Sequence, residues 1–405
     1  MTGPERRASF SLAFVYAMRM LGLFLVLPVF ALEAPHYPGG DDPALVGLAM
    51  GVYGLTQGLL QLPFGMVSDR LGRKRVIVFG LLVCAAGSAL AASADTLAWL
   101  IIGRCLQGAG AVSAVVTALL ADLTRDVVRT KAMALVGASI GLMFALSLVL
   151  APALAAWAGL PGLFALTAAL ALAALAVVLW AVPVEPPRRP RPARGSLRAV
   201  LTHVPTLRLN FGVFVLHGVM LAMWVSVPGM LVEAGLAKSR HWWIYLPTVT
   251  ASFFVMSATL FPLERRGYLR AVFLSAVGLI ALAYLGLACA AAAQANHPGA
   301  IGLGVLGLLL FVFFCGSNIL EASQPSIASR AAPPDARGAA LGFYNTLQSL
   351  GFFAGGLAGG ALLKAGGPVS LFLACAAVTG LWLAVAWPMD ATPAATPSSP
   401  PTPGT

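Results

Sequence analysis

Twelve apolar runs, separated by short polar connections, constrain the fold of this chain more than any other feature. Most contain 20 residues or more, the length that an α-helix needs to cross the hydrocarbon core of a bilayer. Only 10% of the residues are charged, against about 25% in soluble domains. We therefore predict an all-α membrane protein with twelve transmembrane helices at residues 9–32, 44–67, 75–93, 96–121, 132–156, 161–182, 207–232, 241–263, 270–293, 299–323, 339–363 and 369–387.

The basic residues are concentrated in alternate connections between these runs. The chain carries 25 Lys and Arg residues and a formal net charge of +11. Only Lys238, Arg240 and Lys364 fall in the other set of connections, whereas Arg19 and Arg104 fall inside apolar runs. Because basic loops are retained in the cytoplasm, we expect both termini to be cytoplasmic. The positive charge then reflects orientation and contact with anionic headgroups, not a nucleic-acid partner.

One long interior break divides six predicted helices from six others. Residues 183–206 are rich in Pro and Arg, which favours an extended cytoplasmic linker with its arginines near lipid headgroups. We predict two six-helix halves, 1–182 and 207–388, and a disordered Pro/Thr/Ser tail, 389–405. Basic turns recur at corresponding places in the halves, as in transporters built from parallel repeats, whose substrates bind between the repeats near the midplane.

A polar stretch joins the second and third predicted helices. Residues 65–75 read Gly-Met-Val-Ser-Asp-Arg-Leu-Gly-Arg-Lys-Arg, and we expect a tight turn at the membrane surface, made possible by its glycines. An acid among cations favours a specific contact, although a plain positive-inside loop is the alternative. We expect a charge network of Asp69, Arg73 and Asp122, and we predict a gate that consists of Gly65, Asp69, Arg70, Gly72, Arg73 and Asp122.

Ionisable residues inside the predicted helices are candidates for function, because each costs at least ~2.5–3.5 kcal/mol near the bilayer centre. Arg19, Arg104, His217 and Glu321 belong to the first, fourth, seventh and tenth predicted helices. Two cations favour anionic or polar substrates. The alternative is that Arg19 pairs with a carbonyl or with Glu321 and only braces the bundle.

Other polar residues accompany them on the same or neighbouring helices. Tyr53 and Gln57, like Tyr344 and Gln348, are four residues apart and therefore project from one helix face. A polar stripe in a membrane helix is typical of a cavity wall, although hydrogen bonding between helices is an equal alternative. We predict a substrate and proton pathway lined by Arg19, Tyr53, Gln57, Arg104, Gln107, His217, Asn318, Glu321, Tyr344 and Gln348.

Glycines at intervals of four lie on three predicted helices. They are Gly47, Gly51, Gly54 and Gly58 on the second, Gly137 and Gly141 on the fifth, and Gly351, Gly355 and Gly359 on the eleventh. Small residues let membrane helices pack closely. We expect these three helices and the eighth to form the contact between the halves, the alternative being packing within one half.

Several chemistries are not indicated. The five cysteines lie in apolar runs without a Cys-x-x-Cys pair, so neither disulfides nor a zinc site is predicted. Gly-Ala-Ser-Ile-Gly at residues 137–141 lies within a predicted membrane helix, not in the strand–turn–helix that a nucleophile elbow needs. No nucleotide-binding Walker motif is present. We expect no enzyme activity, cofactor or metal.

The stretch Gly-x-x-x-Asp-Arg-x-Gly-Arg-Lys at residues 65–74 resembles the signature loop of the major facilitator superfamily. Residues 18–22, 51–57, 103–108 and 318–323 add a resemblance to the YajR-like branch of its bacterial drug/proton antiporters. The resemblance implies two pseudo-symmetric six-helix bundles, an inner gate latched by residues 69–75, and an Arg104 that assists proton movement. The chain departs from the antiporter motif of the fifth helix, which here reads Ala-Pro-Ala-Leu-Ala-Ala at residues 151–156.

From these features we expect a monomeric secondary transporter of the bacterial inner membrane that works by alternating access. The expected activity is efflux of small amphiphilic compounds against inward proton flow. Glu321 is the expected proton carrier, with His217 or Asp122 as further candidates and Arg104 as a modulator. The alternatives are a sugar or metabolite symporter or facilitator and, in a different class, a membrane sensor or embedded enzyme without transport.

Overall fold

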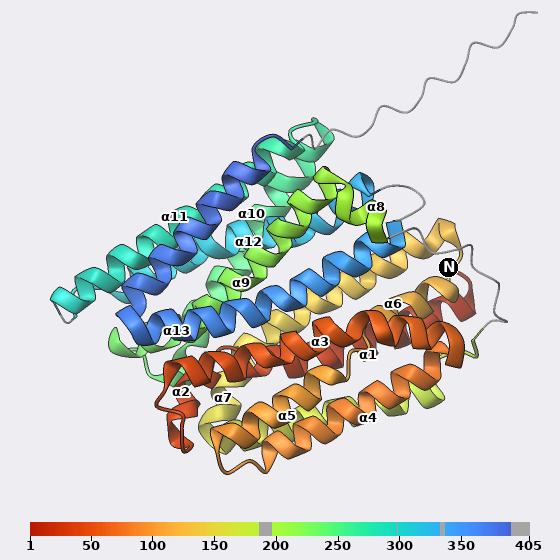
Figure 1. Cartoon of the computed structure of the whole chain (residues 1–405), viewed down its shortest axis with the longest axis horizontal. Coiled ribbons are helices and arrows are strands. Elements are labelled where there is room, and N and C mark those ends of the chain that lie inside the picture. The colour runs from red at the N-terminus through yellow and green to blue at the C-terminus, as the bar shows by residue number, and fades with distance from the viewer. Residues whose placement is uncertain (186–196, 298, 333–336, 390–405) are drawn as a thin grey trace, which may run out of the picture.

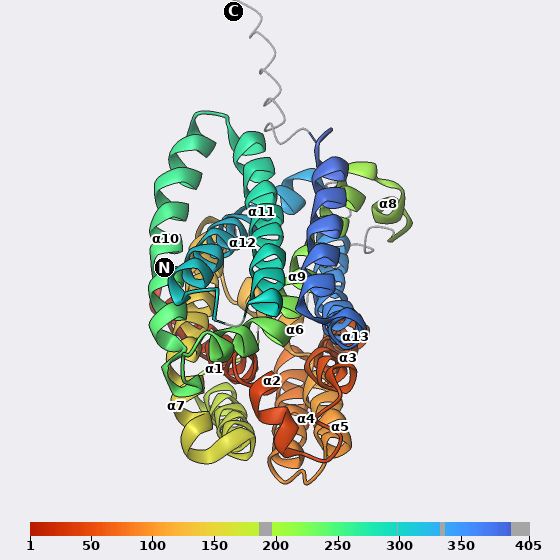
Figure 2. The same ribbon diagram turned by 90° about the vertical axis from the view of Figure 1, so that its left-hand side faces the viewer.

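A computed structural model describes residues 1–185, 197–297, 299–332 and 337–389. Within these ranges the chain is helical and contains no strand. Figure 1 shows two stacked layers, one built from the first half of the chain and coloured red to yellow, the other from the second half and coloured green to blue. The same stacking is visible after a quarter turn in Figure 2.

The described residues contain ten helices that are long and apolar enough to cross a membrane. Two of them, α7 and α13, are each divided by a glycine with positive φ, Gly159 at 60° and Gly367 at 70°, and therefore cross twice. A proline follows closely in each case and prevents a continuous helix. The predicted twelve transmembrane helices are confirmed on this basis. The helix bounds are α1 Gly3–Val26, α2 Phe30–Glu33, α3 Pro43–Leu71, α4 Arg73–Ala92, α5 Leu97–Ala109, α6 Ser113–Asp122, α7 Asp126–Trp180, α8 Leu197–Thr202, α9 Val204–Glu233, α10 Trp242–Arg265, α11 Leu269–Asn296, α12 Leu303–Ala331 and α13 Arg337–Ala386.

The turn predicted over residues 65–75 is much shorter in the structure. Helix α3 continues through Leu71, and α4 begins at Arg73. Gly72 alone makes the turn, with φ 107°, a backbone conformation that favours glycine. Gly65 lies inside α3, and a Cβ added there would meet nothing within 4 Å. The expectation that Gly65 lets the chain turn is therefore wrong in this structure.

Helices α3 and α13 form the close contact between the two halves, and they lie side by side in both views (Figures 1 and 2). A Cβ on Gly47 would overlap the carbonyl oxygen of Gly356, and one on Gly51 would lie 2.8 Å from the carbonyl oxygen of Phe353. The expected contact between the second and eleventh transmembrane helices is confirmed. Without glycine at these positions, the two backbones would have to separate.

On the eleventh transmembrane helix, the glycines predicted to contact the other half face α9 of their own half instead. A Cβ on Gly351 or Gly355 would meet backbone atoms of α9, which belongs to the same half, and one on Gly359 would meet Ala222 of α9. For Gly351, Gly355 and Gly359 the alternative reading, packing within one half, is correct. Gly356 and Gly360 face α3 instead.

The fifth transmembrane helix, the first part of α7, makes a looser contact with α10. A Cβ on Gly141 would lie 3.5 Å from the Phe253 ring, and one on Gly137 would meet nothing within 4 Å. The predicted glycine ridge is therefore not used for close packing there. The linker arginines at 188–194 and the tail from 390 lie outside the described residues, so the predictions made for them remain predictions.

Candidate substrate and proton site

The guanidinium of Arg19 lies on α1 inside the amino-terminal half, and its residue is 7% exposed. Its Nη1 donates to Ser113 Oγ at 2.6 Å, and its Nη2 donates to Tyr53 Oη at 2.9 Å. Both acceptors are neutral hydroxyls. The predicted alternative of a pair with Glu321 is not found, because that carboxylate bonds elsewhere.

Arg104 on α5 is fully buried. Its Nε and Nη2 donate to the backbone carbonyls of Ala49 and Met50 at 3.3 and 3.0 Å, and its Nη1 donates to Gln107 Oε1 at 2.9 Å. The guanidinium also lies over the ring of Tyr53, 5.1 Å from its centroid. Tyr53 therefore contacts one cation through its hydroxyl and a second through its ring face.

A small cavity lies where the two halves meet beside Tyr53. It has room for about 10 Å³, about one water molecule, so this centre is almost closed in the present conformation. The amino-terminal half contributes polar and apolar groups to it, and the carboxyl-terminal half contributes only apolar side chains. The lining residues are Leu23, Leu27, Met50, Tyr53, Gly54, Arg104, Leu221 and Phe352.

A histidine–carboxylate pair occupies the carboxyl-terminal half. His217 on α9 is buried, its Nδ1 lies 2.9 Å from the carbonyl oxygen of Val213, and its Nε2 lies 2.8 Å from Glu321 Oε1 on α12. Nε2 is also 2.7 Å from Gln348 Nε2 on α13. Because a carbonyl only accepts, Nδ1 must carry a proton, and the exchangeable proton of the ring is therefore on Nε2.

This pair is connected to the cavity through one aromatic ring. The Phe352 ring packs edge-on against the His217 ring, with centroids 4.9 Å apart and an interplanar angle of 81°. Phe352 is also a wall of the central cavity. A change of charge or position at His217 therefore reaches the cavity through a direct packing contact.

The other predicted pathway residues make hydrogen bonds between helices or are buried. Asn318 Nδ2 donates to Ser252 Oγ at 2.7 Å, and Gln107 Nε2 donates to Ser88 Oγ at 2.9 Å. For these two, the alternative of helix–helix hydrogen bonding matches the observed contacts. The remaining two, Gln57 and Tyr344, are buried.

The predicted charge network is present at the end of the bundle that carries the α3–α4 turn, here called the motif end. Arg73 Nη2 lies 2.7 Å from Asp69 Oδ1, and Arg73 Nε lies 3.0 Å from Asp122 Oδ2. Nη1 of the same arginine donates to Ser68 Oγ at 2.6 Å. Arg70, the residue after Asp69 on α3, is exposed. Asp122 thus belongs to this network and is not among the residues that line the central cavity, and its role as a proton carrier stays a prediction.

Glu185 is a contact that the sequence analysis missed. Its carboxylate accepts from the backbone N–H of Arg73 at 3.1 Å and from that of Lys74, at the first turn of α4. A carboxylate at a helix amino terminus is favoured by the free N–H groups and the helix dipole. The available signal was an acid directly after the sixth transmembrane helix, at the same membrane face as the start of α4.

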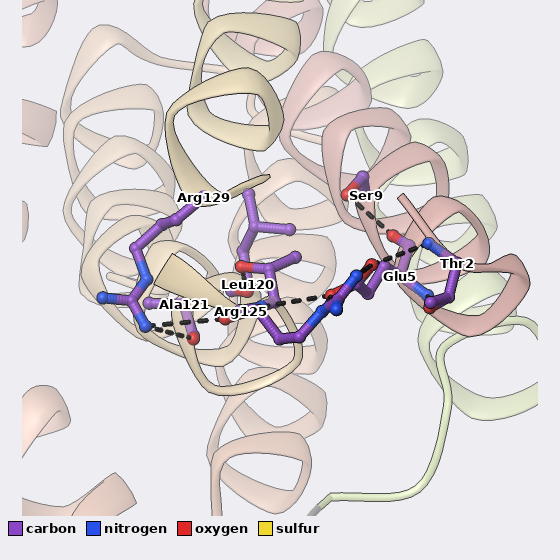
Figure 3. A network of polar contacts seen from close by, with 8 residues as sticks. Thr2, Glu5, Ser9, Leu120, Ala121, Arg125 and Arg129 are labelled. Carbon is purple, nitrogen blue, oxygen red and sulfur yellow. Dashed lines mark hydrogen bonds and ion pairs between the residues drawn. The ribbon is translucent and has the colours of Figure 1, made fainter. Parts of the chain in front are cut away.

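A second network at the motif end ties the start of the chain to the α6–α7 connection (Figure 3). Arg125 Nε and Nη2 donate to the Glu5 carboxylate at 2.7 and 3.2 Å. Glu5 in turn accepts from the backbone N–H of Thr2, which completes the amino-terminal cap of α1. This ion pair raises the pKa of the Arg125 guanidinium above its usual value.

The opposite end of the bundle, here called the α2 end, carries two ion pairs that join the halves. Lys238 Nζ lies 2.6 Å from Glu33 Oε1, and Lys364 Nζ lies 2.7 Å from Asp42 Oδ2. The hydrogen bond from Lys364 and one from the Ala44 backbone hold the pKa of Asp42 below its usual value. Both pairs break if the halves separate at this end.

Two pseudo-equivalent helical halves, a closed polar centre between them and ion pairs across one end are typical of a membrane transport protein. The sequence matches the Major Facilitator Superfamily over residues 12–356. It is 40% identical over 397 residues to the inner membrane transport protein YajR of Escherichia coli strain K12, covering 97% of this chain and 85% of the relative. It is 28% identical to the multidrug resistance protein MdtH of Aeromonas salmonicida, covering 85% and 84% of the two chains.

Among solved structures, a peptide transporter of the POT family in an auto-inhibited state superposes with a TM-score of 0.74. Its sequence identity is 14%, and the match covers 97% of this chain and 99% of that one. This likeness concerns the fold. Together with the match over most of the chain, these findings show that the protein belongs to the Major Facilitator Superfamily, a family of transporters and not of enzymes.

Proposed function

We propose that this protein is a proton-coupled exporter of small amphiphilic compounds and that His217 and Glu321 carry the proton. The observation that supports this most is the 2.8 Å contact between His217 Nε2 and the Glu321 carboxylate, which Phe352 separates from the central cavity. The relative MdtH, which is a multidrug resistance protein by name, supports export of amphiphilic compounds.

The chemistry of His217 explains how one proton changes the local contacts. When the ring is neutral, Nε2 is an acceptor and can take a hydrogen bond from the Gln348 amide, 2.7 Å away. When Nε2 is protonated, it becomes a donor to the Glu321 carboxylate, 2.8 Å away. Loading or releasing the proton therefore exchanges the partners of a ring that packs on the cavity wall at Phe352.

The motif end is proposed to be cytoplasmic, with both termini on that side of the bacterial inner membrane and the protein acting as a monomer. The excess of Lys and Arg at that end supports this orientation, and the relative YajR is an inner membrane protein by name. Glu321 lies past the middle of α12 towards the motif end, and its side chain is 40% exposed. With the α2 end closed by ion pairs, the proton site of this conformation exchanges with the cytoplasm.

Solute-driven proton movement tests the proposal without control of protein orientation. The purified protein is reconstituted into liposomes that contain a pH-sensitive dye, and amphiphilic anions and cations are added outside. An exchange of solute for protons makes the lumen more alkaline. A symporter makes it more acidic, and a facilitator leaves its pH unchanged.

Matched variants show whether the proposed pair carries the proton. Glu321→Gln is expected to reduce the solute-driven pH change at least tenfold, because the amide cannot exchange a proton with His217. Glu233→Gln, at the exposed end of α9, serves as the control and should keep wild-type flux. Unchanged proton movement in Glu321→Gln would exclude Glu321 as a carrier.

A further inference from the structure

Arg19 and Arg104 place two positive charges inside the amino-terminal half without a carboxylate in contact. Among the described residues, their well-formed hydrogen bonds go to two hydroxyls, two backbone carbonyls and the Gln107 amide, all of them neutral. The Cys84 thiol is a further neighbour of Arg19. An uncompensated cation in a membrane interior is unfavourable and is retained mainly where it binds something.

The two arginines differ in how completely they are held. Arg104 uses all three nitrogens, two of them on fixed backbone carbonyls, which is what a bracing role requires. Arg19 donates through its two terminal nitrogens to hydroxyls that can rotate away, and the Cys84 thiol is a further, weak acceptor. Its buried Nε makes no hydrogen bond of standard geometry among the described residues. Arg19 therefore keeps an unused donor beside acceptors that a ligand can replace.

The residues around Arg19 and the cavity indicate the chemical class of the ligand. Arg19 and the cavity share Tyr53, whose hydroxyl accepts from the guanidinium and which also lines the cavity. Across the cavity, Leu221 and Phe352 of the other half offer only apolar surface. A molecule that satisfies both sides has an anionic group with two or more acceptor oxygens, which can accept from both arms of a guanidinium, and an apolar body.

We infer that Arg19 is the recognition site for the acidic group of an organic anion, a carboxylate or sulfonate attached to an apolar body. This inference rests on the proposed transport function and specifies its substrate class. The anionic oxygens replace Ser113 Oγ and Tyr53 Oη as acceptors and also take the hydrogen bond of the unused Nε. Because the present cavity holds only about one water, the halves must separate at one end to admit the ligand.

Two probes of equal size and opposite charge test the inference. The full chain, purified in a non-ionic detergent, is titrated with 2-naphthalenesulfonate and, separately, with 2-naphthylmethylammonium, and binding is measured by calorimetry and by the shift in Tm. The anion is expected to bind at least tenfold more tightly than the cation. This comparison uses the wild-type protein and does not depend on the folding of any variant.

Variants then locate the binding site. Arg19→Gln should weaken binding of the anion at least tenfold, Arg19→Lys should restore part of it, and Arg240→Gln, exposed at the α2 end, should leave it unchanged. Preferred binding of the cation, binding of neither probe, or undiminished anion binding in Arg19→Gln would overturn the inference. These results are separate from proton coupling, because binding in detergent involves no gradient and Glu321→Gln should still bind the anion.

Discussion

Tyr53 shows how a single side chain organises the amino-terminal half of the site. Its hydroxyl accepts from Arg19, its ring lies under Arg104, and the residue lines the cavity that the two halves share. Arg104 adds a rigid element, because two of its donors bind the carbonyls of α3 just before Tyr53. Tyr53 thus positions Arg19 and is itself in contact with the rigidly held Arg104.

Among single residues, Arg73 offers the clearest test by substitution. Arg73→Ala removes the cation that pairs with both Asp69 and Asp122. Breaking a buried pair costs about 3–5 kcal/mol; here the carboxylate side chains are 29% and 27% exposed, and we expect about 1–3 kcal/mol because solvent screens them. A clear fall in Tm in detergent is the measurement, with the exposed Arg75→Ala as control. Equal Tm values for the two variants would contradict a stabilising network.

The sequence identified most of these polar residues but not their partners. His217 and Glu321 are both exceptional in apolar helices, yet the sequence does not say that α9 and α12 bring them within 2.8 Å. The network of Asp69, Arg73 and Asp122 was predictable because opposite charges cluster at one membrane face. Glu185 was missed because its partners are backbone N–H groups, which carry no signal in side-chain types.

At the scale of elements, the α3–α13 contact depends on glycines that face each other. The sequence predicted both helices, but it placed the contact on Gly351, Gly355 and Gly359, which pack against α9. Two glycine ridges run along α13, and the helical period is the same for both. Only the three-dimensional structure shows which ridge faces which neighbour. The predicted helix ends at residue 67, whereas α3 continues to Leu71. Charged residues continue a helix as readily as they form a turn once the chain leaves the bilayer, so the sequence did not fix this end.

This contact gives a sharp prediction about helix packing. Gly47→Ala places a methyl group against the carbonyl oxygen of Gly356, and overpacking of this kind costs about 1–3 kcal/mol. Gly65→Ala, on the same helix with nothing within 4 Å, should leave stability unchanged or raise it, because alanine favours a helix interior. Tm should therefore fall in Gly47→Ala and stay equal to the wild-type value or rise in Gly65→Ala. A loss of stability in Gly65→Ala that matches Gly47→Ala would contradict the account.

At the scale of the whole molecule, the two halves are joined at the α2 end by ion pairs and along α3 and α13 by close packing. The large apolar core includes residues from both halves, so the present conformation is a packed one and not two loosely associated bundles. The export proposed above requires this arrangement to exchange with one that is open at the α2 end. The ion pairs are suited to such an exchange, because their charged groups can be hydrated when they separate.

The pH dependence of this closure follows from Asp42. Its pKa is lowered by Lys364, so the pair stabilises the closed end fully above the unfolded value of about 4 and loses that contribution as the pH falls through the lowered value. We expect the distance between labels across the α2 end to increase in acid, and we expect Asp42→Asn to be open to the same extent at neutral pH. A closed end that is insensitive both to acid and to Asp42→Asn would show that this pair does not hold it.

We propose that the two halves move relative to each other about a buried polar centre. Distances between paired spin labels test it most directly, after replacement of the five native cysteines. One pair, at Val127 and Arg265, spans the motif end, and another, at Asp41 and Ser239, spans the α2 end, all at exposed positions. On changing pH and adding transported solute, the account predicts that one distance lengthens as the other shortens. Two distances that stay fixed, or that lengthen together, would contradict it.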